Sequence, residues 1–288
     1  MQRIGGRKVV RPLRRGDGAG VDLARYYDLD VAAEQTDVAM YLALASASDG
    51  PILELACGSG RICVPLAAAG HHVTGVDLDP DMLERAREAW AVHGRRTSTA
   101  RSLELIEADM TRLALDQQFD LVILAFSSLL LLPDRHAQES LLQTMRAHLA
   151  PDGRAVIDIW LPTPEDLALY DGRTILEWVR RDEETGENVS KTTAARYEHA
   201  TSQATIETFF DAWLETETPR RSYRRDEIRF TSAAELLALV ESVGLRPQMV
   251  AGDYSMSEYT PDSERLIVVA AGPGADRRPR RSTRLSLV

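Results

Sequence analysis

Two glycines mark the first part of the chain that has the chemistry to hold a ligand. Gly58 and Gly60 follow a short apolar run that ends at Ala56, and a helical pattern begins directly after them. Glycine tolerates positive φ and has no side chain, so a ligand can approach the backbone closely. The following helix presents its unpaired N–H groups at the same point. This spacing indicates a ligand-binding loop between a strand and a helix.

An acidic residue at the end of the next apolar run adds a second binding group. Asp77 lies 17 residues after Gly60. A carboxylate at that place can accept hydrogen bonds from both hydroxyls of a ribose. Loop and carboxylate together predict a ligand that contains a nucleoside.

The loop departs from the dinucleotide-binding pattern in two ways. The spacing Gly-x-Gly-x-x-Gly needs a third glycine at position 63, where the chain has Cys63. Glu54 lies inside the strand end, where its carboxylate would repel a pyrophosphate but suits a cationic ligand that carries an amino group. This contrast favours S-adenosylmethionine over NAD.

These residues need a parallel sheet to bring them together. Apolar runs alternate with helical patterns over residues 52–160, which is typical of βαβ units. The predicted strands are Ile52–Ala56, His72–Asp77, Leu103–Glu107, Phe119–Ala125 and Arg154–Trp160. Helices are predicted at Val21–Ala47, at Arg61–Ala69, from Pro80 onward and at Asp134–Leu149, with a turn at 151–153. The ligand site of such a sheet lies beyond the carboxyl ends of its strands.

A different pattern follows Trp160. Four segments rich in Thr, Tyr, Phe, Trp and Ile alternate partly between polar and apolar residues, which predicts an antiparallel insert laid over the sheet. These segments are Thr174–Arg181, Asn188–Glu198, Ala204–Leu214 and Ser222–Phe230. The chain then returns to a predicted helix at Thr231–Val243 and to strands at Leu245–Val250 and Arg265–Ala271.

Together, these motifs resemble the class I S-adenosylmethionine-dependent methyltransferases. The matching stretches are 51–61, 70–87, 107–110, 119–125 and 149–154. The resemblance covers residues 21–160 and resumes at 226–271. It implies an α/β fold with a Rossmann-like class I methyltransferase sheet, mostly parallel with an antiparallel last strand, and an antiparallel β lid insert.

The resemblance also implies where the cofactor, S-adenosyl-L-methionine, binds. The loop that holds the methionine part matches Glu54, Ala56, Gly58, Ser59 and Gly60. The ribose-binding acid matches Asp77, and the adenine-binding residues match Leu78, Asp109 and Met110. The segment beside the methyl donor matches Ala125, Phe126 and Ser127.

The acceptor is predicted to be a small molecule. Enzymes that methylate base amines in nucleic acids carry an Asn/Asp-Pro-Pro-aromatic run where this chain has 125–128. Neither cysteine lies in a Pro-Cys loop at that place, and we find no cluster of Asp or Asn that would hold a catalytic metal. The whole-chain pattern instead resembles bacterial N- and O-methyltransferases of small molecules, including those that modify amino sugars and natural products such as antibiotics.

Methyl transfer from a sulfonium depends mainly on proximity and orientation, and a hydroxyl acceptor also needs a general base. Candidates for a catalytic group are Tyr26, in the predicted N-terminal helix, and His136, at a predicted helix start. Candidate acceptor contacts are Tyr27, Trp160 and Tyr197. The acceptor atom stays open, and a cofactor-binding protein that catalyses a non-methylating reaction such as cyclisation stays an alternative.

Charge is distributed unevenly along the chain. The 288 residues carry a net charge of −10, with +6 in the first 16 residues and +4 in the last 13. The remaining 259 residues therefore carry −20, which repels phosphate backbones and disfavours nucleic-acid binding. A nucleic-acid methyltransferase recruited by the Arg-rich tails is a third hypothesis, and truncation of the tails tests it.

The remaining composition indicates a cytoplasmic protein without a membrane partner. No apolar run approaches the ~20 residues needed to cross a bilayer, and no apolar segment follows the basic N-terminus as in a secretory signal. The two cysteines provide neither a disulfide framework nor zinc-site spacing. A homodimer is expected because it is common among the proteins that the chain resembles.

The patterns also predict how the chain is divided. The expected parts are a basic tail at 1–16, an N-terminal helix with the donor-binding core at 17–160, an antiparallel lid at 161–230, the completion of the core sheet at 231–272 and a second basic tail at 273–288.

Overall fold

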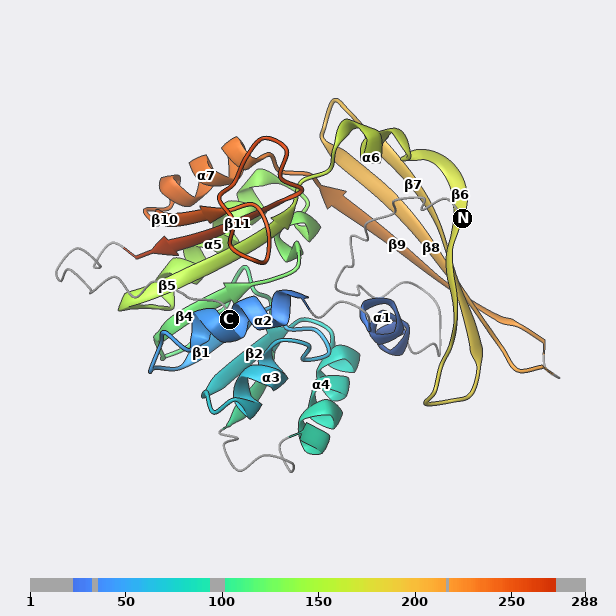
Figure 1. Cartoon of the computed structure of the whole chain (residues 1–288), viewed down its shortest axis with the longest axis horizontal. Coiled ribbons are helices and arrows are strands. Elements are labelled where there is room, and N and C mark those ends of the chain that lie inside the picture. The colour runs from blue at the N-terminus through green and yellow to red at the C-terminus, as the bar shows by residue number, and fades with distance from the viewer. Residues whose placement is uncertain (1–22, 33–35, 94–101, 216–217, 273–288) are drawn as a thin grey trace.

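Two β-sheets organise the protein (Figure 1). The computed structural model describes residues 23–32, 36–93, 102–215 and 218–272. Within these residues, the larger sheet has seven strands in the order β10-β11-β5-β4-β1-β2-β3, and the smaller has four in the order β6-β7-β8-β9. The smaller sheet is built from one continuous part of the chain, between β5 and α7.

The strands of the larger sheet are β1 Ile52–Leu55, β2 Val73–Asp77, β3 Leu103–Glu107, β4 Phe119–Leu124, β5 Leu149–Trp160, β10 Arg246–Ala251 and β11 Arg265–Ala271. The strands of the smaller sheet are β6 Asp171–Arg181, β7 Asn188–Glu198, β8 Gln203–Trp213 and β9 Arg220–Arg229. The helices are α1 Leu23–Val31, α2 Thr36–Ala45, α3 Cys63–Ala68, α4 Pro80–His93, the 3₁₀ helix η1 Ser128–Leu131, α5 Arg135–Ala147, α6 Pro164–Ala168 and α7 Ala233–Ser242.

The direction of the strands confirms the predicted fold class. Strands β1 to β5 pair in parallel, and β11 pairs antiparallel with both β5 and β10. The sheet is therefore mostly parallel with an antiparallel edge, and the smaller sheet is antiparallel throughout. We call the smaller sheet, β6 to β9, the lid sheet.

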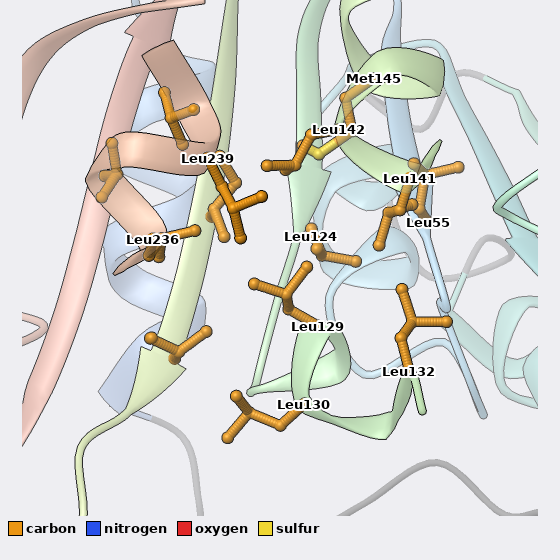
Figure 2. Packing of buried hydrophobic residues seen from close by; sticks show 14 of the residues in the cluster. Leu55, Leu124, Leu129, Leu130, Leu132, Leu141, Leu142, Met145, Leu236 and Leu239 are labelled. Atoms are coloured by element: carbon orange, nitrogen blue, oxygen red, sulfur yellow. The ribbon is translucent and has the colours of Figure 1, made fainter. Parts of the chain in front are cut away.

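Apolar side chains fill both faces of the larger sheet. All four residues of β1 are buried, which is typical of a parallel strand covered by helices on both sides. Figure 2 shows one of the two layers, in which leucines of α5, α7 and η1 pack against leucines of β1 and β4. Residues of α2 and α3 cover the other face, among them Tyr41 and Leu66.

The predicted single helix over 21–47 is wrong, because the structure has two helices there. Helix α1 packs on the lid sheet, where Tyr26 lies among Trp178, Val189 and Phe210. Helix α2 packs on the larger sheet with α3. Each helix has its own apolar partner, and the interrupted apolar stripe of the sequence reflects these two different surfaces.

The turn predicted at 151–153 lies within β5 as the structure defines it. The register between β4 and β5 shifts there, because Phe119 pairs with Leu149 whereas Leu121 already pairs with Arg154. The intervening residues bulge out of the ladder. A side chain at Gly153 would lie 2.7 Å from the carbonyl oxygen of Phe119, so the bulge needs a glycine.

No helix in the described part of the chain is both long and apolar enough to cross a membrane.

Candidate functional site

Strand β1 delivers the glycine loop to the centre of the larger sheet. Ala56, Gly58 and Gly60 have positive φ, of 55°, 56° and 86°. A side chain at Gly60 would also lie 2.8 Å from Val64 and 3.3 Å from the backbone of Ala86. The loop is therefore pressed against α3 and α4, and its backbone faces the carboxyl ends of the strands.

Asp77 ties this loop to β2. Its Oδ2 accepts a hydrogen bond of 2.8 Å from the Gly58 N–H, and its Oδ1 accepts one of 2.9 Å from the Asp79 N–H. Burial raises the pKa of the Asp77 carboxyl, and the two N–H donors act in the opposite direction. Each carboxylate oxygen can accept more than one hydrogen bond, so Asp77 can hold the loop and still accept a bond from a ligand hydroxyl.

A cavity of about 520 Å³ opens beside Asp77 at the ends of β2 and β3. Its lining includes the four residues expected at ribose and adenine, namely Asp77, Leu78, Asp109 and Met110. The Oδ1 of Asp109 accepts hydrogen bonds of 2.8 and 2.7 Å from the amide and hydroxyl of Thr111, which fix its carboxylate. Leu78 is 61% exposed, and it offers an apolar face at the cavity edge. The size lies within the range of small-molecule sites.

Glu54 has a buried carboxyl under the glycine loop. The residue is 3% exposed, and its Oε2 has no hydrogen-bond partner in the described structure. Burial raises the pKa of Glu54 to about 8, although the nearby Arg61 lowers it. A buried carboxyl oxygen without a partner costs free energy, so a cationic group placed against Oε2 would be stabilised there.

A smaller hollow adjoins Glu54 and meets the larger cavity at Ala56, which lines both. Its volume is about 20 Å³, and Tyr27 and Phe126 close it on the side of α1 and β4. Tyr27 also lies close to the loop, because a side chain at Gly58 would be 4.0 Å from its ring. Burial raises the pKa of Tyr27 to about 12, so its hydroxyl is protonated at neutral pH.

Arg61 connects this hollow to α2. Its two terminal nitrogens donate hydrogen bonds of 2.6 and 2.7 Å to the two carboxylate oxygens of Asp37. Its guanidinium carbon lies 4.4 Å from the centre of the Phe126 ring. Fork geometry and a stacked ring both restrict the arginine, so it fixes the wall of the hollow.

The backbone turns sharply where β4 ends. Phe126 and Ser127 have positive φ, of 54° and 65°, a conformation that costs free energy without glycine. Asp158 of β5 holds the turn, because its Oδ2 accepts hydrogen bonds of 3.1 Å from the Phe126 N–H and from the Tyr254 hydroxyl. Its Oδ1 accepts bonds of 2.9 and 2.7 Å from Arg265. Such strained turns cluster at functional sites.

The sequence did not predict the groups that support the hollow and the turn. For Arg61, its position directly after the glycine loop was the only indication of a role in the sequence. Nothing in the sequence indicated a role for Asp37 or Asp158, since their partners lie 24 and 107 residues away along the chain. Tyr254 and Arg265 lie in segments that resemble the family, but without a predicted role.

The two candidate catalytic groups lie on different elements of the structure. Tyr26 is 2% exposed and stacks on Phe210 of the lid sheet with ring centres 5.0 Å apart. His136 is exposed in the first turn of α5, beside Pro133 and Ala137 of the larger cavity. Neither residue is among those that line the larger cavity or the smaller hollow, and their catalytic role stays a prediction.

The remaining acceptor candidates surround Phe230. Trp160 and Tyr197 contact its ring edge-on, with centres 5.7 Å apart in both cases. Trp160 is also tied to the turn after β4, because its backbone N–H donates a 2.9 Å hydrogen bond to Ser127 Oγ. These aromatic residues join the lid sheet to the larger sheet. Tyr27, the third candidate, lies instead over the glycine loop.

A mostly parallel seven-stranded sheet with a glycine loop, an acid after β2 and a cavity beyond β3 defines a nucleoside-binding enzyme of the class I methyltransferase type. Residues 52–153 match the family model described as a methyltransferase domain. The chain is 30% identical over 177 residues to dTDP-3-amino-3,4,6-trideoxy-alpha-D-glucopyranose N,N-dimethyltransferase of Streptomyces venezuelae, which covers 59% of this chain and 69% of that protein.

Other comparisons agree. The cypemycin N-terminal methyltransferase of a Streptomyces species is 26% identical over 221 residues, which covers 76% of this chain and 81% of that protein. The solved structure of Streptomyces venezuelae DesVI has a TM-score of 0.69 at 23% identity and covers 88% of this chain and 99% of that one. A methyltransferase from Clostridium acetobutylicum has a TM-score of 0.70 at 18% identity and covers 88% and 98%. The chain belongs to the class I S-adenosylmethionine-dependent methyltransferases.

Proposed function

We propose that the protein transfers a methyl group from S-adenosyl-L-methionine to an amine of a small molecule in natural-product biosynthesis. The cypemycin relative is named for an N-terminus and the Streptomyces venezuelae relative for N,N-dimethylation of an amino sugar. Both names place the methyl group on nitrogen, which supports an amine acceptor here. None of the comparisons supports the non-methylating alternative.

One observation carries the placement of the donor. The buried Glu54, with its unpartnered Oε2, lies in a hollow that meets the cavity of Asp77 at Ala56. A nucleoside that carries a cationic amino group matches this pair of carboxyls. In this proposal Asp77 accepts hydrogen bonds from the ribose, and Glu54 accepts the amino group.

The other residues expected from the sequence complete the proposed donor site. Leu78, Asp109 and Met110 surround the adenine, and the backbone of Gly58, Ser59 and Gly60 lies along the methionine part. Ala125, Phe126 and Ser127 flank the methyl group. Because a hollow of about 20 Å³ has room for little more than a water molecule, Tyr27 moves away from the loop when the donor binds.

The chemistry asked of the protein is mainly orientation. The donor, when bound, supplies an activated methyl group on a sulfonium. The turn at Phe126 and Ser127, fixed by Asp158, orients the acceptor beside that group, and proximity of this kind can be worth ~7–11 kcal/mol. An uncharged amine carries its own lone pair and needs no side chain to deprotonate it before attack, which agrees with the absence of Tyr26 and His136 from the described linings of the two cavities.

Incubation with methyl-labelled donor and a panel of small amines, amino sugars and phenols tests the proposal. We expect label on at least one amine, with the product heavier by one methyl in place of one hydrogen. Transfer to phenols alone contradicts the amine assignment. An acceptor converted to an isomer of unchanged mass contradicts methyl transfer and supports cyclisation.

Three further expectations belong to this proposal. Residues 17–160 and 231–272 form the donor-binding unit, and 161–230 form a lid over the acceptor. The protein works in the cytoplasm, where its two buried cysteines stay reduced. It acts as a homodimer, and its partner is a small-molecule acceptor. Sedimentation analysis at several protein concentrations tests the dimer.

A further inference from the structure

One face of the lid sheet is enclosed in the molecule. On β8, Ile206 belongs to the apolar cluster shared with η1 and the larger sheet, whereas Phe210 packs on α1. Side chains alternate along a strand, so Thr208 points to the same face, midway between these two contacts. Thr208 is 4% exposed. We call this the inner face of the lid.

A row of polar side chains crosses the inner face at Thr208. Thr193 of β7 pairs directly with Thr208, and Thr208 pairs directly with Arg224 of β9. Directly paired residues of antiparallel strands project on the same side, so the three side chains lie next to one another. Ile206 and Phe210 lie on either side of the row along β8, whereas their direct partners on the neighbouring strands include the buried polar residues Lys191, Ser222 and Asp226.

Two members of the row have donor groups that no described residue accepts from. The hydroxyl oxygen of Thr193 is buried and makes no hydrogen bond in the described structure. Arg224 is 7% exposed, and its Nε donates a 2.6 Å hydrogen bond to Asp226 of the same strand. Within the described residues, neither terminal nitrogen of Arg224 has a hydrogen-bond partner.

The Thr193 hydroxyl is costly for a purely structural sheet. Buried polar groups are nearly always paired, and an unpaired one costs free energy. Asp226 fixes the guanidinium through Nε and leaves the other edge of the planar fork available. That edge matches two oxygens of a carboxylate or a phosphate. A threonine hydroxyl beside it adds a further donor to the same oxygens.

The row lies at a useful distance from the proposed site of methyl transfer. Ile228, four residues after Arg224 on β9, packs in the cluster that contains η1, and η1 directly follows the turn at Phe126 and Ser127. Four residues of strand span roughly 13 Å. A small molecule can therefore place an amine near the turn and an anionic group at Arg224.

We propose that Arg224, with Thr193 and Thr208, binds an oxyanion of the acceptor, so that the acceptor is an amine that also carries a carboxylate or a phosphate. This inference rests on the proposed function, because it assigns a chemical class to the acceptor of the same site. Asp226 positions Arg224 and does not touch the acceptor.

The test compares matched probes by calorimetry on the full chain saturated with S-adenosylhomocysteine. One pair is an amino sugar and its 1-phosphate, and the other is a dipeptide and its C-terminal amide. We expect the anionic member of one pair to bind at least about tenfold more tightly, as for a charge-assisted hydrogen bond. Preference within the first pair identifies a phosphate, and preference within the second identifies a carboxylate.

Variants assign the preference to the row. Arg224→Gln should abolish it, whereas Arg225→Gln should retain it, because Arg225 is an exposed arginine paired with Glu227 on the opposite face. Arg224→Lys keeps a cation beside Asp226 without the fork and should give an intermediate preference. Binding of S-adenosylhomocysteine to each variant verifies that the donor site is intact.

Thr193→Val separates binding from stability. Removal of a buried, unpaired hydroxyl should leave the melting temperature unchanged or higher, while the anionic probe binds about two- to tenfold more weakly. The inference is overturned if the wild type binds the two members of each probe pair equally, or binds none of them. It is also overturned if Arg225→Gln loses the preference for the anionic probe to the same extent as Arg224→Gln. If the wild type binds no donor or transfers no methyl group, the proposed function is contradicted instead. The two failures are distinguishable, because the binding of the probes is measured without turnover.

Discussion

At the scale of single residues, the environment of Glu54 has a consequence for pH. Its carboxyl is protonated in the unliganded protein below about pH 8, because burial raises its pKa to about 8. The proposed donor presents a cationic amino group, which binds the ionised carboxylate more favourably than the neutral acid. Donor binding and ionisation of Glu54 are therefore linked.

We expect the affinity for S-adenosylhomocysteine to increase from pH 6 to pH 8, by up to about tenfold per pH unit below the pKa. Above the pKa of Glu54 the dependence should level off, since the carboxylate is then already ionised. Glu54→Gln removes the titrating group and should give weaker binding with a flat profile. Calorimetry across this pH range measures the affinity of both proteins for S-adenosylhomocysteine. An affinity of the wild type that does not change with pH contradicts the role of Glu54.

Asp77 gives a second prediction at this scale. Asp77→Ala removes the proposed acceptor of the ribose hydroxyls and the anchor of the Gly58 N–H. The affinity for S-adenosylhomocysteine should fall by about 1–3 kcal/mol. Asp81→Ala serves as the matched control, because Asp81 is an exposed carboxylate in the first turn of α4. Equal affinities for wild type and Asp77→Ala would place the ribose elsewhere.

The residues around the larger cavity could be predicted because their chemistry is local in the sequence. The glycine loop and Asp77 each follow directly from a strand end, and the structure brings Asp77, Leu78, Asp109 and Met110 to one cavity. Tyr26 illustrates the opposite case. It is adjacent to Tyr27 in sequence, but the helix directs it into the lid sheet, where its ring stacks on Phe210.

At the scale of elements, α1 connects the lid sheet to the donor-binding sheet. Arg25 of α1 makes buried ion pairs with Asp182 and Glu187 of the lid hairpin, at 2.7 and 3.2 Å. The same helix carries Tyr27 over the glycine loop. These pairs therefore couple α1, and with it Tyr27, to the lid sheet.

Arg25→Ala should detach α1 from the lid sheet. Removal of one partner leaves Asp182 buried without its cation, and this typically costs about 3–5 kcal/mol. Amide hydrogen exchange should rise in α1 and in the β6–β7 hairpin while β1 and β4 keep their protection. Arg87→Ala removes an exposed pair with Glu84 and should change neither region. Equal exchange in wild type and Arg25→Ala would show that the pairs do not hold the helix.

The elements themselves were predictable to different degrees. Alternation of apolar runs predicted the strands of both sheets, and Asp134 caps α5 through the Ala137 N–H as expected at a helix start. The break between α1 and α2 was not predictable, because it depends on which surface each helix covers. Contacts such as Arg25 to Asp182 join residues 157 positions apart, and no local pattern encodes them.

At the scale of the whole molecule, charge separates the body of the protein from its ends. The central 259 residues carry −20, whereas the two basic tails carry +6 and +4. The tails lie outside the described residues. A strongly acidic body disfavours a polyanionic substrate such as nucleic acid, and it agrees with a cationic donor and an amine acceptor.

Deletion of residues 1–16 and 276–288 should leave methyl transfer to small amines unchanged. The proposed site uses none of these residues, and physiological salt weakens interactions between exposed charges. Steady-state kinetics of the truncated and full-length proteins at the same ionic strength provide the measurement. A large fall in kcat/KM after truncation would assign the tails a role in catalysis or acceptor binding.

The central claim is that the donor lies across the ends of β1, β2 and β3. A crystal structure of the complex with S-adenosylhomocysteine tests it most directly. We predict ribose hydroxyls within hydrogen-bond distance of Asp77, the adenine in the cavity with Asp109 and Met110, and the amino group at Glu54 Oε2. A ligand whose ribose does not reach Asp77, or whose amino group lies away from Glu54, would contradict this placement.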